Sequence, residues 1–379
     1  MKIGLVTITE LDNFGNRLQN YALQSVLQHL GHTVETIPNY IIYKKRKNPL
    51  YKMLLAFYGI YKWLVIKNKN VISGLKKQKR FEKFDSEYIC FSSKYSTINF
   101  IPKDLDNDYD AFIAGSDQIW NSNFLFNFEF NFLRFAQERK RISYAASFGT
   151  DSIKSEYVDM FKQYLSEMSD ISVRESAGKK LVEKLTDKTA TVVLDPTMLL
   201  DSEKWSEIER KPKWALEDNY ILTYYLGDTK CRKAVFDQIY NENEKYKSYQ
   251  VVDIFDTNMP KQYASTPNEF LWLIHHATLM ITDSFHGTVF SILFGTPFCI
   301  SRRIDGNASM QSRFDSLFEI LDIKTDGLIT DVKEQTAVFV KLEEYRRISI
   351  AYLKEALDNS EKVRCLASVR EESIRRVIE

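Results

Sequence analysis

The sequence has 379 residues, of which 44% are hydrophobic and 27% are charged. These values predict a folded protein with more than one domain rather than a disordered chain. The formal net charge of +1 argues against a nucleic-acid-binding protein, because binding to phosphate backbones needs a basic surface. The four cysteines are widely separated, which offers neither a disulfide framework nor a metal-binding spacing and favours a reducing cytoplasm. No segment is long and apolar enough to span a bilayer.

Short apolar segments alternate with helical ones along the chain. Residues 2–9 predict a first strand, residues 16–31 a helix that ends at Gly31, and residues 32–37 a second strand. This alternation is typical of parallel sheets with crossover helices, and it starts again after residue 218, so we expect two Rossmann-like doubly wound α/β domains. Further strands are expected within residues 109–117, 141–149, 170–176, 190–196, 219–227, 249–256, 277–284 and 296–301.

The segment between the two series of strands contains two prolines and no clear strand. We therefore expect a domain boundary near residues 197–215. The first domain would span residues 1–200, with a basic, aromatic helical insertion at about 41–84, and the second would span residues 201–334. Residues 335–379 are predicted to form charged helices that return to the first domain.

Charge is unevenly distributed along the sequence. Residues 41–80 hold twelve Lys and Arg and no Asp or Glu, and Leu54, Phe57, Tyr61 and Trp63 lie among the lysines. Basic residues beside aromatic and aliphatic ones suit a helix that lies in a membrane interface. A helical hairpin that packs its apolar face on its own domain would have the same composition. Both interpretations stay open at this stage.

Two doubly wound domains that face each other place strand ends and helix starts around one cleft, where such sheets bind ligands. The loop after the first strand holds Asn13, Gly15 and Asn16, just before a helix. Free N–H groups at that helix start could receive an anion, or the asparagines could simply cap the helix. Each of these residues is a candidate for substrate binding.

Two later strands also end in polar residues. Ser116, Asp117 and Gln118 follow the strand expected within residues 109–117 and could bind a polyol or form a cap. Arg174 lies at the end of the strand expected within residues 170–176, where it could pair with a structural carboxylate such as the adjacent Glu175. Its planar guanidinium also suits a phosphate or a carboxylate of a substrate.

The segment "ITDSFHGTVFSILFGTPF", residues 281–298, places a small polar group of residues between two apolar runs. His286 is expected near a helix start, and Ser284, Gly287 and Thr288 add hydrogen-bond donors and close backbone access. This combination favours an anion site, although a lone histidine can also be a satisfied residue of the core.

Seven motifs in this order resemble the polysaccharide pyruvyl transferases, over residues 1 to about 322. They are "NFGNRLQNYALQ", "FIAGSDQIWN", "YAASFG", "SVRESAG", "VLDPTMLL", "TDSFHGTVFSILFGTPF" and "SRFDSLFEIL". The resemblance implies two domains that resemble the B-type glycosyltransferases (a GT-B-like fold). It also implies a cytoplasmic enzyme of capsule or exopolysaccharide biosynthesis, which transfers pyruvate from phosphoenolpyruvate to a sugar diol as a cyclic ketal.

The resemblance also assigns residues. Arg174 matches a phosphoenolpyruvate-binding arginine, and His286 matches the histidine of the family's site. Characterised branches tend to have Arg-Leu-His where this chain has Ser284-Phe285-His286, so the charge of one arginine would have to come from another position. The candidates are Arg302, Arg303 and Arg313. Phosphoenolpyruvate would be the donor substrate, and neither a cofactor nor a metal is expected. His275 and His276 are expected to face solvent or the core.

Two other functions stay open. A glycosyltransferase that uses a nucleotide sugar would suit the same architecture, with Asp253 or Asp256 at the ribose. A catalytically inactive glycan-binding subunit is the other alternative. For the pyruvyltransferase, the expected partner is a sugar on a lipid-linked oligosaccharide, with the protein peripheral at the inner face of the cell membrane through residues 41–80 and without nucleic acid.

Overall fold

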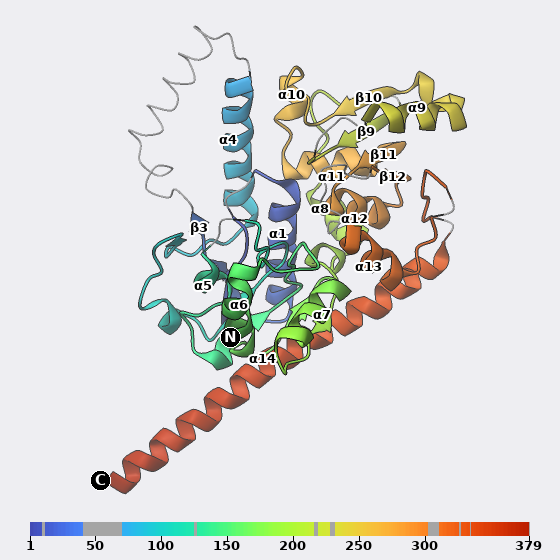
Figure 1. Cartoon of the computed structure of the whole chain (residues 1–379). Coiled ribbons are helices and arrows are strands. Elements are labelled where there is room, and N and C mark those ends of the chain that lie inside the picture. The colour runs from blue at the N-terminus through green and yellow to red at the C-terminus, as the bar shows by residue number, and fades with distance from the viewer. Residues whose placement is uncertain are drawn as a thin grey trace.

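The structure is a computed structural model of the chain (Figure 1). It describes residues 1–9, 12–40, 70–124, 127–215, 219–227, 232–301, 311–325, 327–333 and 335–378. Most of the basic segment, residues 41–69, lies outside these ranges, as do Arg302 and Arg303. The predictions for the aromatic residues of that segment therefore have no structural counterpart here.

The first unit is built on a parallel sheet with the strand order β2-β1-β5-β6. The central strand β1 pairs with β2 on one side and β5 on the other, so that Ile3 lies opposite Val34 and Ala111. All four residues of β5 are buried, as expected for a strand with helices on both faces. The strands are β1 (Lys2–Val6), β2 (Thr33–Thr36), β5 (Ala111–Ala114) and β6 (Arg141–Ser143).

Two short pairs of parallel strands extend the first unit. The strands β7 (Ser172–Val173) and β8 (Thr191–Val192) pair with each other, and a bridge between Ala146 and Val173 joins them to the segment after β6. The strands β3 (Asn39–Tyr40) and β4 (Ser96–Thr97) form the other pair. The helices of this unit are α1 (Phe14–His29), α4 (Asn70–Tyr88), α5 (Phe128–Asn131), α6 (Val158–Ser166) and α7 (Ser176–Leu185), and α8 (Ser202–Ile208) follows in the segment between the two units.

The second unit repeats the pattern with the strand order β10-β9-β11-β12, again entirely parallel. Its strands are β9 (Tyr220–Tyr224), β10 (Gln250–Asp253), β11 (Leu279–Thr282) and β12 (Phe298–Ile300). Its helices are α9 (Arg232–Glu242), α10 (Pro260–Tyr263), α11 (Pro267–His275), α12 (Phe285–Phe294) and α13 (Gln311–Leu321). Short 3-10 helices lie at Leu105–Asp108, Glu138–Lys140, Ser155–Tyr157, Pro196–Met198 and Glu244–Ser248.

Aromatic packing joins the two units. Phe14, the first residue of α1, stacks on Phe270 of α11 with a centroid distance of 4.6 Å and an interplanar angle of 8°. A single cluster of buried residues includes Ile3 of the first sheet and Leu222 of the second. Because this core is shared, the starts of α1 and α12 are held close together. The domain boundary expected near residues 197–215 stays a prediction.

The last helix, α14 (Thr336–Ile378), is one continuous helix that crosses the molecule and extends beyond it toward the C-terminus (Figure 1). Its middle part packs on the first unit. The hydroxyl of Tyr352 donates a hydrogen bond to the backbone oxygen of Ser143 at 2.9 Å, and the hydroxyl of Ser349 accepts one from the backbone N–H of Leu194 at 3.0 Å. Within the described ranges, no helix combines the length and the apolar composition that crossing a bilayer requires.

Candidate active site

Four strand ends meet where the two units face each other. Ser116 and Asp117 follow β5, Arg174 follows β7, and Asp195 follows β8. The fourth is the end of β11, which leads into α12 and His286. The carboxyl ends of parallel strands share one edge of a sheet, so residues that lie far apart in the sequence form a single cluster here.

Arg174 is almost fully buried and is surrounded by carboxylates. Its side chain is 2% exposed, and its Nη1 donates a hydrogen bond to Oδ2 of Asp195 at 2.9 Å. Its Nη2 lies 3.4 Å from Oδ1 of Asp117, and its Nε lies 3.7 Å from Oε2 of Glu175. Burial alone would lower the pKa of Arg174, but Asp117, Asp195 and Glu175 raise it above its ordinary value. The guanidinium is therefore a permanent cation in the middle of the site.

Asp195 connects the residues of the cluster, because both of its carboxylate oxygens accept hydrogen bonds. Its Oδ1 accepts hydrogen bonds from the backbone N–H and the hydroxyl of Thr197, at 3.1 and 2.7 Å, and its Oδ2 accepts one from the hydroxyl of Ser116 at 3.0 Å. Burial raises the pKa of this carboxyl, but the charges of His286 and Arg174 and the hydrogen bond from Thr197 outweigh that effect and hold it well below its usual range. Asp195 is thus a buried carboxylate that stays ionised.

His286 approaches this carboxylate from the second unit. It lies in the first turn of α12, and its Nε2 is 3.6 Å from Oδ2 of Asp195, which is within ion-pair range but longer than a hydrogen bond. On its other side the ring packs against the start of α1, where a Cβ on Gly15 would come within 2.1 Å of Nδ1. Only glycine at position 15 leaves room for the imidazole.

Two buried nitrogens at this junction lack hydrogen-bond partners among the residues that the structure describes. One is Nε2 of His286, and the other is Nδ2 of Asn16, whose residue is 2% exposed. Buried polar groups are almost always paired, so unpaired ones point to a missing ligand or to a functional group. Asn16 follows Gly15 in the sequence and His286 packs against it, which marks this junction as the place where a substrate would complete the site.

The polar group of residues before α12 has both structural and site roles. Asp283 accepts hydrogen bonds from the backbone N–H groups of Leu226 and Gly227, at 2.7 and 2.8 Å, and so holds the loop after β9. The hydroxyl of Ser284 accepts one from the N–H of Gly287 at 3.3 Å, which caps α12. The hydroxyl of Thr288 donates to the backbone oxygen of Ser284. These side chains shape the start of α12, and that start places His286 beside the carboxylate cluster.

The other predicted substrate-binding residues lie around the same strand ends. Asn13 caps α1, because its Oδ1 accepts a hydrogen bond from the N–H of Asn16 at 3.3 Å. Gln118 accepts one at Oε1 from Nδ2 of Asn121 at 2.7 Å. Asp117 has a φ of 65°, a left-handed conformation that is costly for a residue other than glycine. This conformation accompanies a carboxylate that lies beside Arg174.

Phe285 lies between the cluster and a second arginine. The guanidinium carbon of Arg174 lies 4.2 Å from the centre of the Phe285 ring, and that of Arg313 lies 5.9 Å from it. Arg313 is 5% exposed and lies in the first turn of α13. Of the three arginines expected to replace the family's missing one, Arg313 is therefore near the site, while Arg302 and Arg303 fall outside the described ranges.

The carboxylates around Arg174 outnumber its single positive charge, so Arg174 alone cannot neutralise an anionic substrate. Three carboxylates, those of Asp117, Glu175 and Asp195, lie within 4 Å of its nitrogens. An anionic substrate would need additional positive charge, and a variant without Arg174 would leave buried carboxylates unpaired. From the sequence alone, Arg174→Ala is expected to fold and to lose turnover, but the burial of its three carboxylate partners makes a large loss of stability the expected result.

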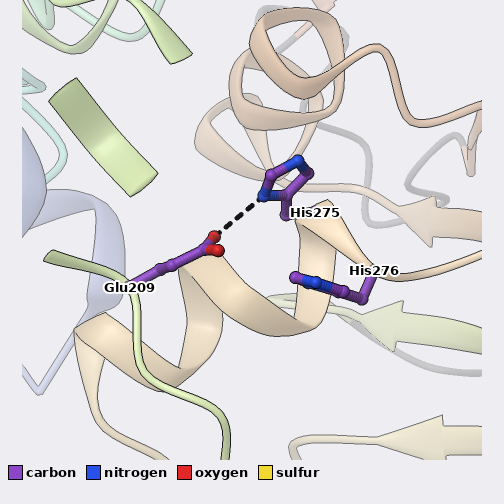
Figure 2. Close-up of side chains that lie close together, drawn as sticks. All are labelled: Glu209, His275 and His276. Carbon is purple, nitrogen blue, oxygen red and sulfur yellow. Dashed lines mark hydrogen bonds and ion pairs between the residues drawn. The ribbon is translucent and has the colours of Figure 1, made fainter. Parts of the chain in front are cut away.

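The sequence provides no reason to expect a metal site, but the fold brings one possible set of ligands together on the surface. Glu209, at the end of α8, lies beside His275 and His276 at the end of α11, and their potential ligand atoms lie within 4.8 Å of one another. Figure 2 shows the imidazole of His275 turned toward Glu209, with Nδ1 and Oε2 2.9 Å apart. Nδ1 of His276 bonds instead to the backbone oxygen of Trp272 at 3.0 Å. Both Nδ1 atoms are thus engaged, and the geometry is that of a histidine–carboxylate pair.

Asp195 and Glu175 are the site residues that sequence reasoning missed. Asp195 lies in "VLDPTMLL", which follows a predicted strand in the same way as the candidates at the other strand ends. Its place after β8 was a usable signal, because carboxylates at strand ends lie at the ligand-binding edge. Glu175 stood out in the sequence only as a structural partner of Arg174. Its Oε1 accepts a hydrogen bond from the hydroxyl of Ser147 at 2.7 Å.

Solved structures with this arrangement of two doubly wound units include sugar-nucleotide epimerases. A putative UDP-N-acetylglucosamine 2-epimerase from Listeria monocytogenes has a TM-score of 0.50 at 10% identity, covering 95% of this chain and 90% of its own. The UDP-GlcNAc 2-epimerase from Neisseria meningitidis has a TM-score of 0.45 at 12% identity, covering 98% and 100%. At these identities the likeness concerns the fold alone, and it is the GT-B-like fold predicted from the sequence.

The sequence itself matches no curated protein. A sequence model of one family, described as polysaccharide pyruvyl transferase, matches residues 13–301. That range includes the start of α1, the three strand ends of the first unit and the segment that carries His286. The chain therefore belongs to the polysaccharide pyruvyl transferase family, whose members are transferases that act on polysaccharides.

Proposed function

We propose that this protein transfers the pyruvyl group of phosphoenolpyruvate to two hydroxyls of one sugar, forming a cyclic ketal and releasing phosphate. The observation that carries the proposal is the buried pair of His286 and Asp195. Nε2 of His286 lies 3.6 Å from Oδ2 of Asp195 and lacks a hydrogen-bond partner among the described residues. An imidazole beside an ionised carboxylate is suited to hold a proton and to deliver it to a substrate.

The reaction begins when a proton moves from the imidazolium of His286 to the methylene carbon of phosphoenolpyruvate. The carbon that bears the phosphate becomes an oxocarbenium-like centre. A sugar hydroxyl attacks it and gives its proton to the imidazole of His286, which is thereby protonated again. The bond to phosphate then breaks, the second hydroxyl attacks the same carbon and closes the ring, and its proton leaves with the phosphate as hydrogen phosphate. Asp195 keeps its negative charge throughout and stabilises the imidazolium, as the hydrogen bonds from Thr197 and Ser116 keep it fixed.

The arginines have different roles in this scheme. Arg174 holds Asp195 and Asp117 in place, and its guanidinium offers a charged contact to the donor beside the Phe285 ring. Arg313 lies near the same ring and would supply the additional positive charge that the phosphate and the carboxylate of the donor need, together with Arg302 or Arg303. Asp117 would orient the acceptor diol.

The direct test is to incubate the protein with phosphoenolpyruvate and a panel of lipid-linked sugars, and to measure phosphate release and the mass added to the acceptor. We expect one ketal per acceptor for wild type. The His286→Gln variant should release phosphate at least about 100-fold more slowly, because its amide can still form hydrogen bonds but has no transferable proton. Wild-type turnover in that variant would remove His286 from the mechanism.

Two other functions predict other results in the same assays. A glycosyltransferase that uses a nucleotide sugar would be stabilised against heat by a nucleotide and not by phosphoenolpyruvate. Asp253 and Asp256, the candidates for ribose binding, bond to backbone N–H groups of their own turn, at 2.9 and 2.8 Å. An inactive glycan-binding subunit would release no phosphate from phosphoenolpyruvate with any diol.

The acceptor that suits this proposal is a sugar, such as a galactose-type 4,6-diol, on a lipid-linked precursor of a capsule or an exopolysaccharide. The enzyme would act in the cytoplasm, as a peripheral protein at the inner face of the cell membrane. The feature that supports this location is the basic, aromatic segment of residues 41–80, with its twelve Lys and Arg and no acidic residue.

A further inference from the structure

A pocket lies between α4 and the second unit. Its volume is about 560 Å³, which is within the range of small-molecule sites. Figure 1 shows α4 and α10 side by side in this region, and residues of the two helices contact each other. The pocket is lined by Lys76, Lys79, Arg80, Lys213, Trp214, Pro260, Lys261, Ala264 and Glu269.

Positive charge dominates the lining. Five of its side chains are cations and one is a carboxylate, although the whole chain has a net charge of only +1. On α4, Lys76, Lys79 and Arg80 follow the i, i+3, i+4 spacing that places side chains on one face of a helix. Lys213 and Lys261 come from the other side of the pocket. Cations from two sides that converge on one cavity repel each other unless an anion lies between them.

The one carboxylate of the lining, that of Glu269, already has hydrogen-bond partners within the protein. Oε1 of Glu269 accepts a hydrogen bond from Arg80 at 2.6 Å, and Oε2 accepts one from the backbone N–H of Thr266 at 3.0 Å. Glu269 is 7% exposed, so it orients the guanidinium and leaves the four lysines without a carboxylate in the pocket lining. All four lysines are exposed, so their ammonium groups can turn toward an anion that enters the pocket.

Trp214 adds an aromatic side chain to the lining. The polar groups of the lining are mostly the charged donors of the lysines and the arginine, which suit a ligand rich in acceptors. Beside them, Pro260 and Ala264 offer apolar surface. Such a lining fits an anion that is attached to an organic group.

We propose that this pocket binds the diphosphate group of a diphosphate ester. Four lysines and one arginine supply the positive charge that suits two linked phosphates. The volume leaves room for part of the ester beside the apolar residues. The proposal does not depend on the pyruvyl transfer described above, because it concerns binding at a separate set of residues.

The helix that carries three of the pocket's cations also contacts the start of α1. Lys77, the neighbour of Lys76, lies over the ring of Phe14, with its Nζ 5.1 Å from the ring centre. Phe14 precedes Gly15, which packs against His286. The helix α4 is therefore a common element of the pocket and of the packing beside the candidate active site.

Calorimetric titration with inorganic pyrophosphate at low salt tests the proposal. The test variant is Lys79→Gln with Lys261→Gln, which removes one cation from each side of the pocket. The matched control is Lys83→Gln with Lys245→Gln, which removes the same charge from exposed positions on α4 and in the second unit. We expect the test variant to bind at least about 10-fold more weakly than wild type, and the control to stay within about twofold.

Two further probes identify the source of the diphosphate. Uridine diphosphate represents a nucleotide and farnesyl diphosphate an isoprenoid lipid, and either one that binds more tightly than pyrophosphate and loses affinity in the test variant supports the site. The proposal is wrong if wild type does not bind pyrophosphate at millimolar concentration, or if the test and control variants lose affinity equally. Because the readout is binding, a failure here leaves the proposed pyruvyl transfer untouched.

Discussion

Asp195 brings together groups that the sequence separates widely. Ser116, Arg174 and Thr197 donate hydrogen bonds to its two oxygens, and His286 lies 3.6 Å away. Each contact either supplies charge or fixes geometry, and the carboxylate is fully buried. A single substitution at this residue should therefore affect both stability and catalysis.

We expect Asp195→Asn to lower the free energy of unfolding by about 3–5 kcal/mol, because Arg174 loses a buried partner. Turnover should fall at least about 100-fold, because the imidazolium of His286 loses its counter-charge. Denaturant unfolding and phosphate release measure the two effects. Asp201→Asn is the control, since asparagine caps α8 as well as aspartate does, and it should change stability by less than about 0.5 kcal/mol.

Wild type and Asp195→Asn also differ in how their stability depends on pH. The pKa of Asp195 is held below its ordinary value of 3.8, so its ionised form stabilises the fold above that pH, and this stabilisation disappears as the pH falls toward the folded-state pKa. The difference in unfolding free energy between the two proteins should narrow as the pH falls below about 4. A difference that is the same at pH 5 and at pH 3 would contradict the assignment.

Gly15 provides a test of the contact between α1 and His286. In a helix, alanine is ordinarily favoured over glycine by about 1 kcal/mol, so propensity alone predicts that Gly15→Ala stabilises the protein. A Cβ at this position would instead lie 2.1 Å from Nδ1 of His286 and displace the ring. We expect turnover to fall by roughly 100-fold, as is typical when a catalytic group moves by about 1 Å.

Gly74→Ala is the matched control for this change. Gly74 also lies in a helix, α4, but a Cβ added there would meet no atom within 4 Å among the described residues. The variant should gain up to about 1 kcal/mol in unfolding free energy and keep wild-type turnover. If Gly15→Ala behaves in the same way as Gly74→Ala, His286 does not depend on the contact with α1.

At the scale of elements, α4 joins the two units through a buried lysine. Nζ of Lys77 lies over four aromatic rings, those of Phe255, Tyr263, Phe14 and Phe81, at 4.6, 5.0, 5.1 and 5.7 Å from their centres. Phe14 belongs to α1 and Phe81 to α4, while Phe255 and Tyr263 belong to the second unit. Burial lowers the pKa of Lys77 to about 8, although Asp12 opposes the change.

This pKa predicts how stability changes with pH. Between about pH 8 and 10.5 the folded protein releases the proton of Lys77 while the unfolded chain keeps it, so the cost of burying the cation is full below pH 8 and disappears as the pH rises. That cost corresponds to roughly 3 kcal/mol, part of which the aromatic rings offset. Lys77→Met should therefore be more stable than wild type at pH 7, with a difference that narrows toward pH 10.

Denaturant unfolding at pH 7, 8, 9 and 10 measures this difference. Lys83→Met is the control, because Lys83 lies on the same helix with its side chain 70% exposed. Its effect on stability should be small and independent of pH. A Lys77→Met variant that is less stable than wild type at every pH would show that the aromatic contacts outweigh the cost of burial.

At the scale of the whole molecule, the two units face each other, and the basic segment of residues 41–80 belongs to the first unit by its place in the sequence. We expect salt-sensitive binding of the protein to anionic vesicles, because each basic residue near such a surface contributes about 1 kcal/mol and salt screens this attraction. Polar substitution of Leu54, Phe57, Tyr61 and Trp63 should abolish binding and leave activity on a short soluble acceptor. Flotation with anionic vesicles at low and high salt provides the measurement.

Neutral vesicles and a thermal melt serve as controls for that experiment. The polar variant should melt at the same temperature as wild type. Wild type that stays unbound at low salt, or a polar variant that unfolds, would mean that the segment packs on its own domain, the alternative that its composition also allows.

The regular alternation of apolar and helical segments was enough to predict the fold class. The strands of the two four-stranded sheets all lie within the ranges expected from the sequence, and the central ones, which are buried on both faces, are continuous apolar runs that are easy to recognise. The short pair of β3 and β4 was not predicted. The capping of α1 by Asn13, one of the two alternatives left open by the sequence, is also local, since its side chain bonds to an N–H three residues later. Ser284 caps α12 in the same way, although the sequence suggested it only as a donor to an anion. The family was predicted from seven motifs, because they occur along this chain in the same order as in the family.

Only the tertiary structure decided how the site is assembled. Arg174 and His286 were recognised from local patterns, but the carboxylate between them, Asp195, was not, because its contacts join residues that lie far apart in the chain. The basic pocket of α4, the pairing of Glu209 with His275 and the aromatic rings around Lys77 likewise join separate segments. Periodicity records which face of an element is buried, whereas the partner that buries it depends on how the two units pack, and that information is spread over the whole core.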